Sequence, residues 1–181
     1  EICISTFIAK GIDGVILTST VDEPSKIHNR LKKYNVPCVL LDRSLKSMEY
    51  DAGVFLDNKH SLFIATEYLI QHDNRKIVLI SGPVSLSTSK ERVDGYTQAL
   101  KQYGIPIDER LLKYGNYTLE SGFMAINDLQ AEGISFTAIL ACNDVMAIGA
   151  IKALKQSGRK IPDEIEVIGF DNIKICNMLE P

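Results

Sequence analysis

The 181-residue sequence contains no tryptophan and three histidines, and it lacks the motifs of several large enzyme classes. It has no G-x-G-x-x-G, G-x-x-x-x-G-K-[ST], G-x-S-x-G or H-E-x-x-H, the motifs of dinucleotide-binding, P-loop, serine-hydrolase and zinc-protease chemistry. His28, His60 and His72 fall on predicted helices, whereas a general base is expected at a strand end. We therefore expect that the protein is not an enzyme and that it has neither a cofactor nor a metal site.

The four cysteines, Cys3, Cys38, Cys142 and Cys176, form no C-x-x-C pair and lie mostly among apolar residues. This spacing indicates neither a zinc site nor a disulfide framework. Reduced thiols in a protein core are typical of the cytosol. No apolar run approaches the roughly 18 residues of a membrane span, and no signal-peptide pattern is present. We expect a soluble, cytoplasmic protein without a membrane partner.

Charge of either sign is not concentrated in any part of the sequence. Lysine and arginine number 20 against 23 aspartate and glutamate residues, and the two signs are interspersed. No basic stripe with interleaved aromatic residues appears, so this segment itself is a poor candidate for binding nucleic acid. Hydrophobic residues make up 45% and charged residues 24%, which excludes disordered and fibrous classes and leaves an ordinary globular protein.

Short apolar runs alternate with helical periodicity along the chain. In Phe136 to Gly149, FTAILACNDVMAIG, an apolar run ends at Asn143-Asp144 and a helical pattern follows at once. The helical stretches between successive apolar runs are long enough to be crossovers of right-handed βαβ units, which predicts an α/β fold with parallel sheets. Strands are predicted over residues 14–18, 36–41, 53–56, 77–80, 111–115, 137–142 and 165–169.

Two of the predicted helices have inner faces that include tyrosine. One inner face contains Ile27, Leu31 and Tyr34, and helical spacing predicts that all three side chains are buried. Another helix follows the hydroxyl-rich loop 81–89, and its predicted inner face consists of Val93, Tyr96, Leu100 and Tyr103.

Polar pairs follow several of the predicted strands: Asp42-Arg43, Ser81-Gly82, Asn143-Asp144 and Asp171-Asn172. Because the carboxyl ends of parallel strands share one edge, these pairs are expected to line a crevice.

Asn143 or Asp144 could serve as a helix N-cap or as a ligand contact, and both interpretations stay open here. Asp42, Asp144 and Asp171 could also act as paired carboxylates for acid and base catalysis, but no nucleophile or metal set accompanies them.

Seven motifs occur in an order typical of one family: GIDGVIL (11–17), VPCVLLDRS (36–44), FLDN (55–58), HDNRKIVLISGP (72–83) leading to ERVDGY (91–96), TAILACNDVMAIGAIKAL (137–154) and IPDEIEVIGFDN (161–172). Together they resemble the effector-binding core of the lactose-repressor/galactose-repressor (LacI/GalR) family of bacterial transcription regulators. The resemblance covers nearly the whole chain.

This resemblance implies a two-lobed fold like that of periplasmic sugar-binding proteins, with parallel sheets flanked by helices. Residues 1–57 would form an incomplete N-terminal lobe and residues 58–181 most of the C-terminal lobe, so we expect a part of a longer protein. The family further implies a small effector bound between the lobes, homodimerisation and allosteric control of repression. Operator DNA would be read by an N-terminal helix-turn-helix outside this chain.

By matching motifs, the resemblance implies that the effector has polar contacts with Asp42, Arg92, Asn143 and Asp171. It also implies that Tyr117 packs against a flat or apolar face of the effector. An arginine fork and two carboxylates can hold vicinal hydroxyls, and an aromatic plane suits a sugar or a nucleobase. Two further candidates are Thr88, in the loop before Arg92, and Phe170, on the floor of the site.

The residues themselves leave other roles open. Arg92 could be a helix-surface cation, Tyr117 a core aromatic residue and Asp171 a turn residue beside Asn172. The run Asp42-Arg43-Ser44 and the hydroxyls of the 81–89 loop favour a pentose or hexose effector over a purine. The alternative function is that of a sugar-binding protein of a transport system, which shares the fold.

Overall fold

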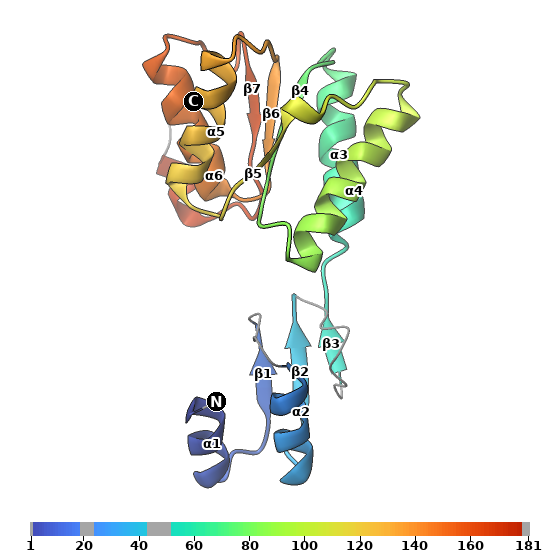
Figure 1. Cartoon of the computed structure of the whole chain (residues 1–181), viewed down its shortest axis with the longest axis vertical. Coiled ribbons are helices and arrows are strands. Elements are labelled where there is room, and N and C mark those ends of the chain that lie inside the picture. The colour runs from blue at the N-terminus through green and yellow to red at the C-terminus, as the bar shows by residue number, and fades with distance from the viewer. Residues whose placement is uncertain (1, 19–23, 43–51, 179–181) are drawn as a thin grey trace. The chain divides into compact units, whose positions relative to one another are not determined.

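The computed structural model describes residues 2–18, 24–42 and 52–178, and it divides into two compact units, Glu1–Asp57 and Asn58–Pro181 (Figure 1). Helices and parallel strands alternate in the second unit, and the first unit also combines helices with a parallel sheet, so the predicted α/β class is confirmed.

The first unit has a three-stranded parallel sheet of order β1-β2-β3. Its core is formed by four buried side chains, Ile27, Leu31, Cys38 and Leu40, which pair the inner face of a helix with the central strand. The elements are α1 (Ile2–Ala9), β1 (Val15–Leu17), α2 (Pro24–Lys33), β2 (Cys38–Leu41) and β3 (Ala52–Val54).

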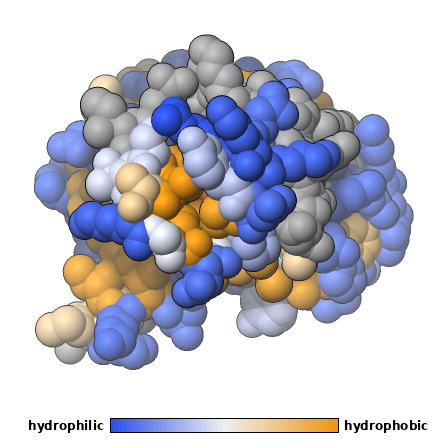
Figure 2. Space-filling view, turned by 90° about the horizontal axis from the view of Figure 1, so that it is seen from below, coloured by the Kyte–Doolittle hydropathy of each residue, from blue (hydrophilic) through white to orange (hydrophobic). Residues whose placement is uncertain are grey.

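Several apolar side chains of this unit remain at the surface. Ile16 on β1 and Val54 on β3 are 69% and 62% exposed. Figure 2 shows the molecule from below, with apolar residues reaching the surface among hydrophilic ones. Tyr34 is 54% exposed, so its predicted burial is wrong. The reason is that α2 ends at Lys33, and the helical spacing from Leu31 no longer holds at Tyr34.

The second unit has a four-stranded parallel sheet of order β5-β4-β6-β7, with α3 and α4 on one face and α5 and α6 on the other (Figure 1). Its elements are α3 (Asn58–Gln71), β4 (Ile77–Ser81), α4 (Ser87–Gln102), the short 3-10 turn η1 (Glu109–Leu111), β5 (Leu112–Tyr114), α5 (Leu119–Ala131), β6 (Ala138–Ala141), α6 (Asp144–Gln156), β7 (Glu166–Ile168) and the 3-10 turn η2 (Lys174–Met178).

The two central strands, β4 and β6, are buried along their whole length, which explains why their sequences are continuously apolar. Tyr96 on α4 is also buried, and its hydroxyl donates to the carbonyl of Ile77 at 2.8 Å. Tyr103 is 41% exposed at the end of α4, so its predicted burial is wrong. Its hydroxyl instead donates to Glu67 on α3 at 2.7 Å, which keeps the polar tip in a surface contact.

Glycines allow the helices on each face of the sheet to approach closely. A Cβ atom on Gly95 of α4 would overlap the carbonyl oxygen of Lys59 on α3. On the other face, a Cβ on Gly122 of α5 would overlap the Met146 carbonyl, and one on Gly149 of α6 would overlap that of Leu119. The helix pairs therefore pack backbone against backbone, with no space for a methyl group.

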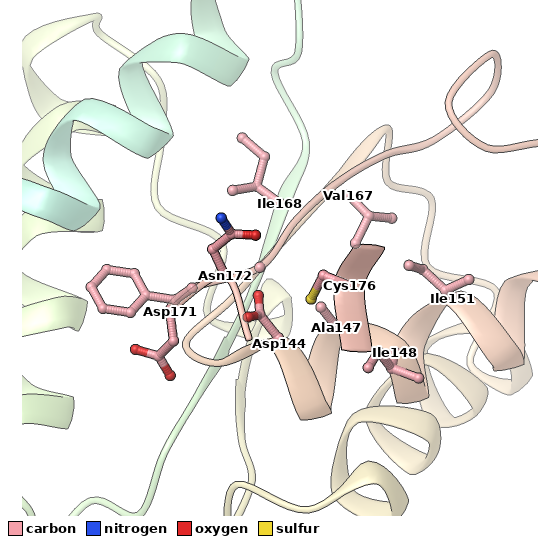
Figure 3. Close-up of a pocket in the computed structure, with 11 residues that line it drawn as sticks. Asp144, Ala147, Ile148, Ile151, Val167, Ile168, Asp171, Asn172 and Cys176 are labelled. Carbon is pink, nitrogen blue, oxygen red and sulfur yellow. The ribbon is translucent and has the colours of Figure 1, made fainter. Parts of the chain in front are cut away.

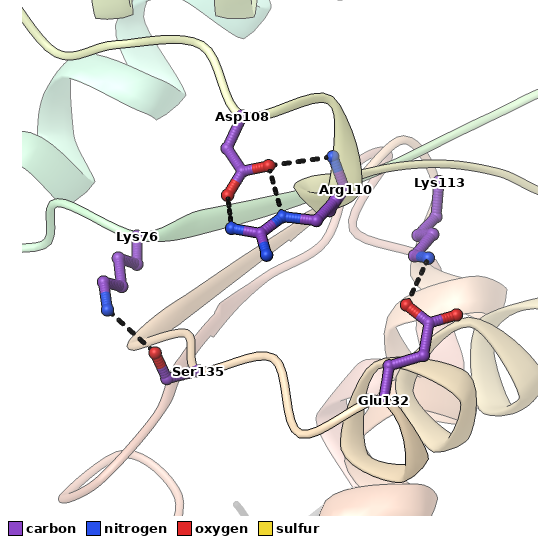
Figure 4. A network of polar contacts seen from close by, with 6 residues as sticks. All are labelled: Lys76, Asp108, Arg110, Lys113, Glu132 and Ser135. Atoms are coloured by element: carbon purple, nitrogen blue, oxygen red, sulfur yellow. Dashed lines mark hydrogen bonds and ion pairs between the residues drawn. The ribbon is translucent and has the colours of Figure 1, made fainter.

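Polar contacts surround the amino ends of the strands (Figure 4). Arg110 donates from Nε and Nη2 to the carboxylate of Asp108 at 2.9 and 2.7 Å, and its backbone N–H donates to the same group at 3.0 Å. Nearby, Lys76 donates to Ser135 at 2.8 Å, and Lys113 lies 3.9 Å from Glu132. The hydrogen bonds from Arg110 lower the pKa of Asp108 to about 2.

We predict that Gly122→Ala destabilises the second unit, because the added methyl must displace the α6 backbone. The expected loss of unfolding free energy is about 1 to 3 kcal/mol, measured by chemical denaturation. Asp128→Ala, at an exposed position of the same helix, is the control, since alanine favours helix there. A Gly122→Ala variant as stable as the parent would contradict the close packing.

A second prediction concerns acid stability. The pKa of Asp108 is depressed in the folded state from 3.8 to about 2, so its stabilising contribution is complete above pH 3.8 and disappears as the pH falls toward about 2. Asp108→Asn should flatten the dependence of unfolding free energy on pH in this window. Arg110→Ala should have the same effect, because it removes the hydrogen-bond donors that lower the pKa. Unchanged profiles for both variants would disprove the linkage.

Candidate functional site

The carboxyl ends of two strands of the second unit, β6 and β7, carry residues that the sequence singled out. Asn143 lies two residues after the end of β6, and Phe170 and Asp171 lie just beyond β7. Arg92 reaches this edge from α4, since its Nη1 donates to the carbonyl of Cys142 at 2.5 Å. The predicted gathering of strand-end residues is therefore present within this unit.

Arg92 is held on several sides. Its side chain is 6% exposed, so it is not a helix-surface cation. The Nε group donates to Asn58 Oδ1 at 2.8 Å, and the guanidinium carbon lies 4.1 Å from the centre of the Phe170 ring. With the bond to the Cys142 carbonyl, these contacts fix the plane of the guanidinium.

Asn143 is the N-cap of α6. Its Oδ1 accepts from the backbone N–H of Met146 at 2.9 Å, as the capping interpretation predicted. Its Nδ2 donates to the carbonyl of Tyr117 at 3.2 Å, which connects the start of α6 to the turn before α5. Asn143 thus orders its surroundings, and contact with an effector remains a prediction for it.

Tyr117 is half-buried and adopts a left-handed backbone conformation with φ of 65°. Its hydroxyl lies 3.0 Å from Ser89 Oγ, at the start of α4. The ring covers Gly82 so closely that a Cβ atom there would overlap the phenol carbon and oxygen. The ring packs against the edge of the core, and glycine is required at position 82 for it to do so.

The structure corrects the predicted location of Thr88. Helix α4 begins at Ser87, so Thr88 lies in its first turn and is 3% exposed, whereas the sequence placed it in a loop. The run of small hydroxyl residues suggested a loop, but their side chains pack inward once the helix forms. Contact between Thr88 and an effector is untested.

The loop after β7 is tied to α6 through Asp144. The Asp144 backbone N–H donates to the Phe170 carbonyl at 3.0 Å, and its Oδ2 accepts from the Ile173 N–H at 2.7 Å. Asp144 is 6% exposed, and its carboxylate holds the loop after β7 through the hydrogen bond from Ile173. Asp171 and Asn172 both have positive φ, 95° and 55°, which confirms the turn interpretation for this pair.

The pKa of the Cys142 thiol is shifted by burial and by the charges near this edge. Burial raises its pKa to about 11; the positive charge of Arg92 opposes this shift, and the negative charge of Asp171 adds to it. Both charged groups therefore lie within electrostatic range of one buried sulfur atom. The thiol itself is protonated and unreactive at neutral pH.

A cavity of about 670 Å³ lies on the outer side of β7, against α6 and η2 (Figure 3). Its walls are mainly aliphatic, and its polar groups come from Asp144, Asp171 and Asn172. Arg92, Tyr117 and Asn143 do not line it. The cavity is therefore distinct from the polar cluster around Arg92, although Phe170 and Asp171 border both.

Asp42 belongs to the first unit. It follows β2, has a φ of 70°, and its backbone N–H donates to the carbonyl of Val54 at 2.8 Å. Its neighbours Arg43 and Ser44 lie outside the described residues. Its role as an effector contact remains a prediction.

Sequence reasoning missed Asn58 as the support of Arg92, and it named Gly82 and Ser89 only within the Ser81-Gly82 pair and the 81–89 loop, without their contacts to Tyr117. Asn58 was visible only as part of the FLDN motif, and nothing in the spacing connected it with Arg92. Within residues 2–18, 24–42 and 52–178, no group of three or more His, Cys, Asp or Glu side chains could hold a metal ion. No helix in the same part of the chain is long and apolar enough to cross a membrane.

Comparison with known proteins gives consistent matches over almost the whole chain. Residues 3–179 match the profile of the family described as "Periplasmic binding proteins and sugar binding domain of LacI family". The probable HTH-type transcriptional repressor ExuR of Bacillus subtilis is 36% identical over 169 residues, which are 93% of this chain and 50% of that protein. The chain thus spans about half the length of this relative.

Solved structures agree with these sequence matches. One, described as "transcriptional regulator CelR-cellobiose complex", has a TM-score of 0.84 and 31% identity, and the match covers 96% of this chain and 53% of that chain. Another is a LacI family regulator from Enterococcus faecium with bound ribose, with a TM-score of 0.84, 25% identity, and coverage of 99% and 66%. The chain belongs to the LacI family of transcriptional regulators and corresponds to its sugar-binding domain.

Proposed function

We propose that this chain is the ligand-sensing part of a transcriptional repressor and binds a small effector, a sugar, through the residues around Arg92. The parent protein would bind operator DNA through an N-terminal helix-turn-helix and act as a cytoplasmic homodimer. The effector would change operator affinity by binding two conformations of the protein with different strength. No chemical reaction is involved.

The observation that carries this proposal is the immobilised guanidinium of Arg92. The contacts with Asn58 and Cys142 use its Nε and Nη1 groups, while Nη2 has no hydrogen-bond partner among the described residues. A planar donor edge that is held in one orientation suits paired hydroxyl or ring oxygens of a ligand. The Phe170 ring lies against the guanidinium, and the Tyr117 ring packs over Gly82 at the carboxyl end of β4.

Sugar is favoured over purine for two reasons. Two of the relatives that were solved with ligands carry a sugar, cellobiose in one case and ribose in the other. Acceptor and donor groups around Arg92, including the amide of Asn143 and the carboxylate of Asp171, also match the hydroxyls of a sugar. Asp42 of the first unit and Thr88 remain predicted contacts. The regulators among the relatives favour repression over the alternative role in transport.

The test is a thermal-shift screen of the intact protein against ribose, cellobiose, other pentoses and hexoses, sugar phosphates, nucleosides and nucleobases. A sugar at about 100 times its dissociation constant should stabilise the fold by roughly 2.7 kcal/mol, which raises the melting temperature by several degrees. Arg92→Ala should abolish the shift. Arg159→Ala, which removes an exposed arginine paired with Glu164, is the matched control. If only nucleobases raise the melting temperature, the proposed effector is a purine and not a sugar.

Gly82 provides an independent prediction. Gly82→Ala should push the Tyr117 ring out of place, and we expect a stability loss of about 1 to 3 kcal/mol and weaker binding of the sugar identified by the screen. In a Tyr117→Ala background, most of the stability loss caused by Gly82→Ala should vanish, because the ring is no longer there to be displaced. Equal losses in both backgrounds, measured by denaturation, would show that Tyr117 is not the group affected.

A further inference from the structure

We propose that Asn58 is the positioning residue for Arg92, and that its side-chain amide sets the orientation of the guanidinium and with it the affinity for the ligand. This inference rests on the proposed function, since Arg92 acts there as an effector contact. Asn58 is the first residue of α3 and the first residue of the second unit. It was not among the residues expected to form the site.

Asn58 lies between two charged side chains of α4. Its side chain is 2% exposed, so its polar atoms must be satisfied by the protein. Oδ1 accepts from Arg92 Nε at 2.8 Å, and Nδ2 donates to Glu91 Oε2 at 3.2 Å. One amide thus places its acceptor toward a cation and its donor toward an anion.

Only an amide in this orientation satisfies both neighbours. Turned over, it would set its NH₂ group against the donors of Arg92 and its oxygen against the carboxylate of Glu91. Aspartate at position 58 would suit Arg92 but repel Glu91 across the same short distance. An apolar residue would leave the Arg92 Nε group buried without an acceptor. The position therefore selects asparagine on electrostatic grounds.

Of the contacts that Arg92 makes, the hydrogen bond from its Nε to Asn58 fixes the rotation of the guanidinium. The Cys142 carbonyl holds Nη1, and the Phe170 ring covers the guanidinium at 4.1 Å. With Nε also held, the guanidinium cannot turn in its plane, so Nη2 keeps a constant direction. Without Asn58 the group could turn about the Cys142 carbonyl, and a ligand would have to restore its orientation on binding.

The experiment exchanges the amide of Asn58 and the neighbouring carboxylate of Glu91. Asn58→Asp places two carboxylates together, and the double variant Asn58→Asp/Glu91→Gln reverses the carboxylate and the amide while keeping the net charge. Asn58→Ala removes the contact, and Asn127→Asp on α5 controls for the added charge. Two readouts are taken in the intact protein: the NMR signal of the Arg92 Nε–H with its exchange rate, and the dissociation constants of ribose and cellobiose.

We expect Asn58→Ala and Asn58→Asp to accelerate exchange of the Arg92 Nε–H and to weaken sugar binding, each by about tenfold or more, the range for a hydrogen bond to a charged group. The double variant should restore most of the slow exchange of the Arg92 Nε–H and most of the sugar affinity. Asn127→Asp should change neither quantity. A purely structural role would not give this recovery in the Arg92 signal.

Two results would overturn the inference: an Arg92 Nε–H equally protected in Asn58→Ala, or a double variant no better than Asn58→Asp. If neither sugar binds the unmodified protein, the proposed sugar function fails for these ligands, but the NMR signal still decides whether Asn58 positions Arg92. If sugars bind and the signal does not respond to Asn58, the proposed function stands and this inference falls.

Discussion

The need to satisfy a buried guanidinium organises the second unit. A cation that is 6% exposed must find acceptors in the protein, and Arg92 finds them in the Asn58 side chain and the Cys142 carbonyl. These partners come from the start of α3 and the end of β6, while Phe170 beyond β7 covers the guanidinium. One side chain from α4 thereby joins three segments that are far apart in the sequence.

Close helix packing makes this arrangement possible. Gly95 lies three residues after Arg92 on the same helix, and its missing side chain lets α4 approach the backbone of Lys59, next to Asn58. The distance between Arg92 and Asn58 is thus set by backbone contact rather than by adaptable side chains. Gly95 therefore contributes both to the packing of α4 against α3 and to the geometry of the polar cluster.

The sequence predicted the fold well where burial is complete. The apolar runs of β4 and β6 and the cap at Asn143 follow from local rules, and the structure confirms them. Predictions failed at helix ends, as for Tyr34 and Tyr103, because periodicity continues in the sequence after the helix has stopped. The pairing of Asn58 with Arg92 could not be predicted either, since it joins residues 34 positions apart through tertiary contact alone.

The attachment of the loop after β7 to α6 has a consequence for ligand binding. Because Asp144 forms hydrogen bonds with both Phe170 and Ile173, the turn at Asp171 is attached to the first turn of α6 on both sides. A ligand that touches this turn does not have to order a free loop, so little conformational entropy is lost there when it binds. Any displacement of the turn would also act on the first turn of α6, because the two segments share these hydrogen bonds.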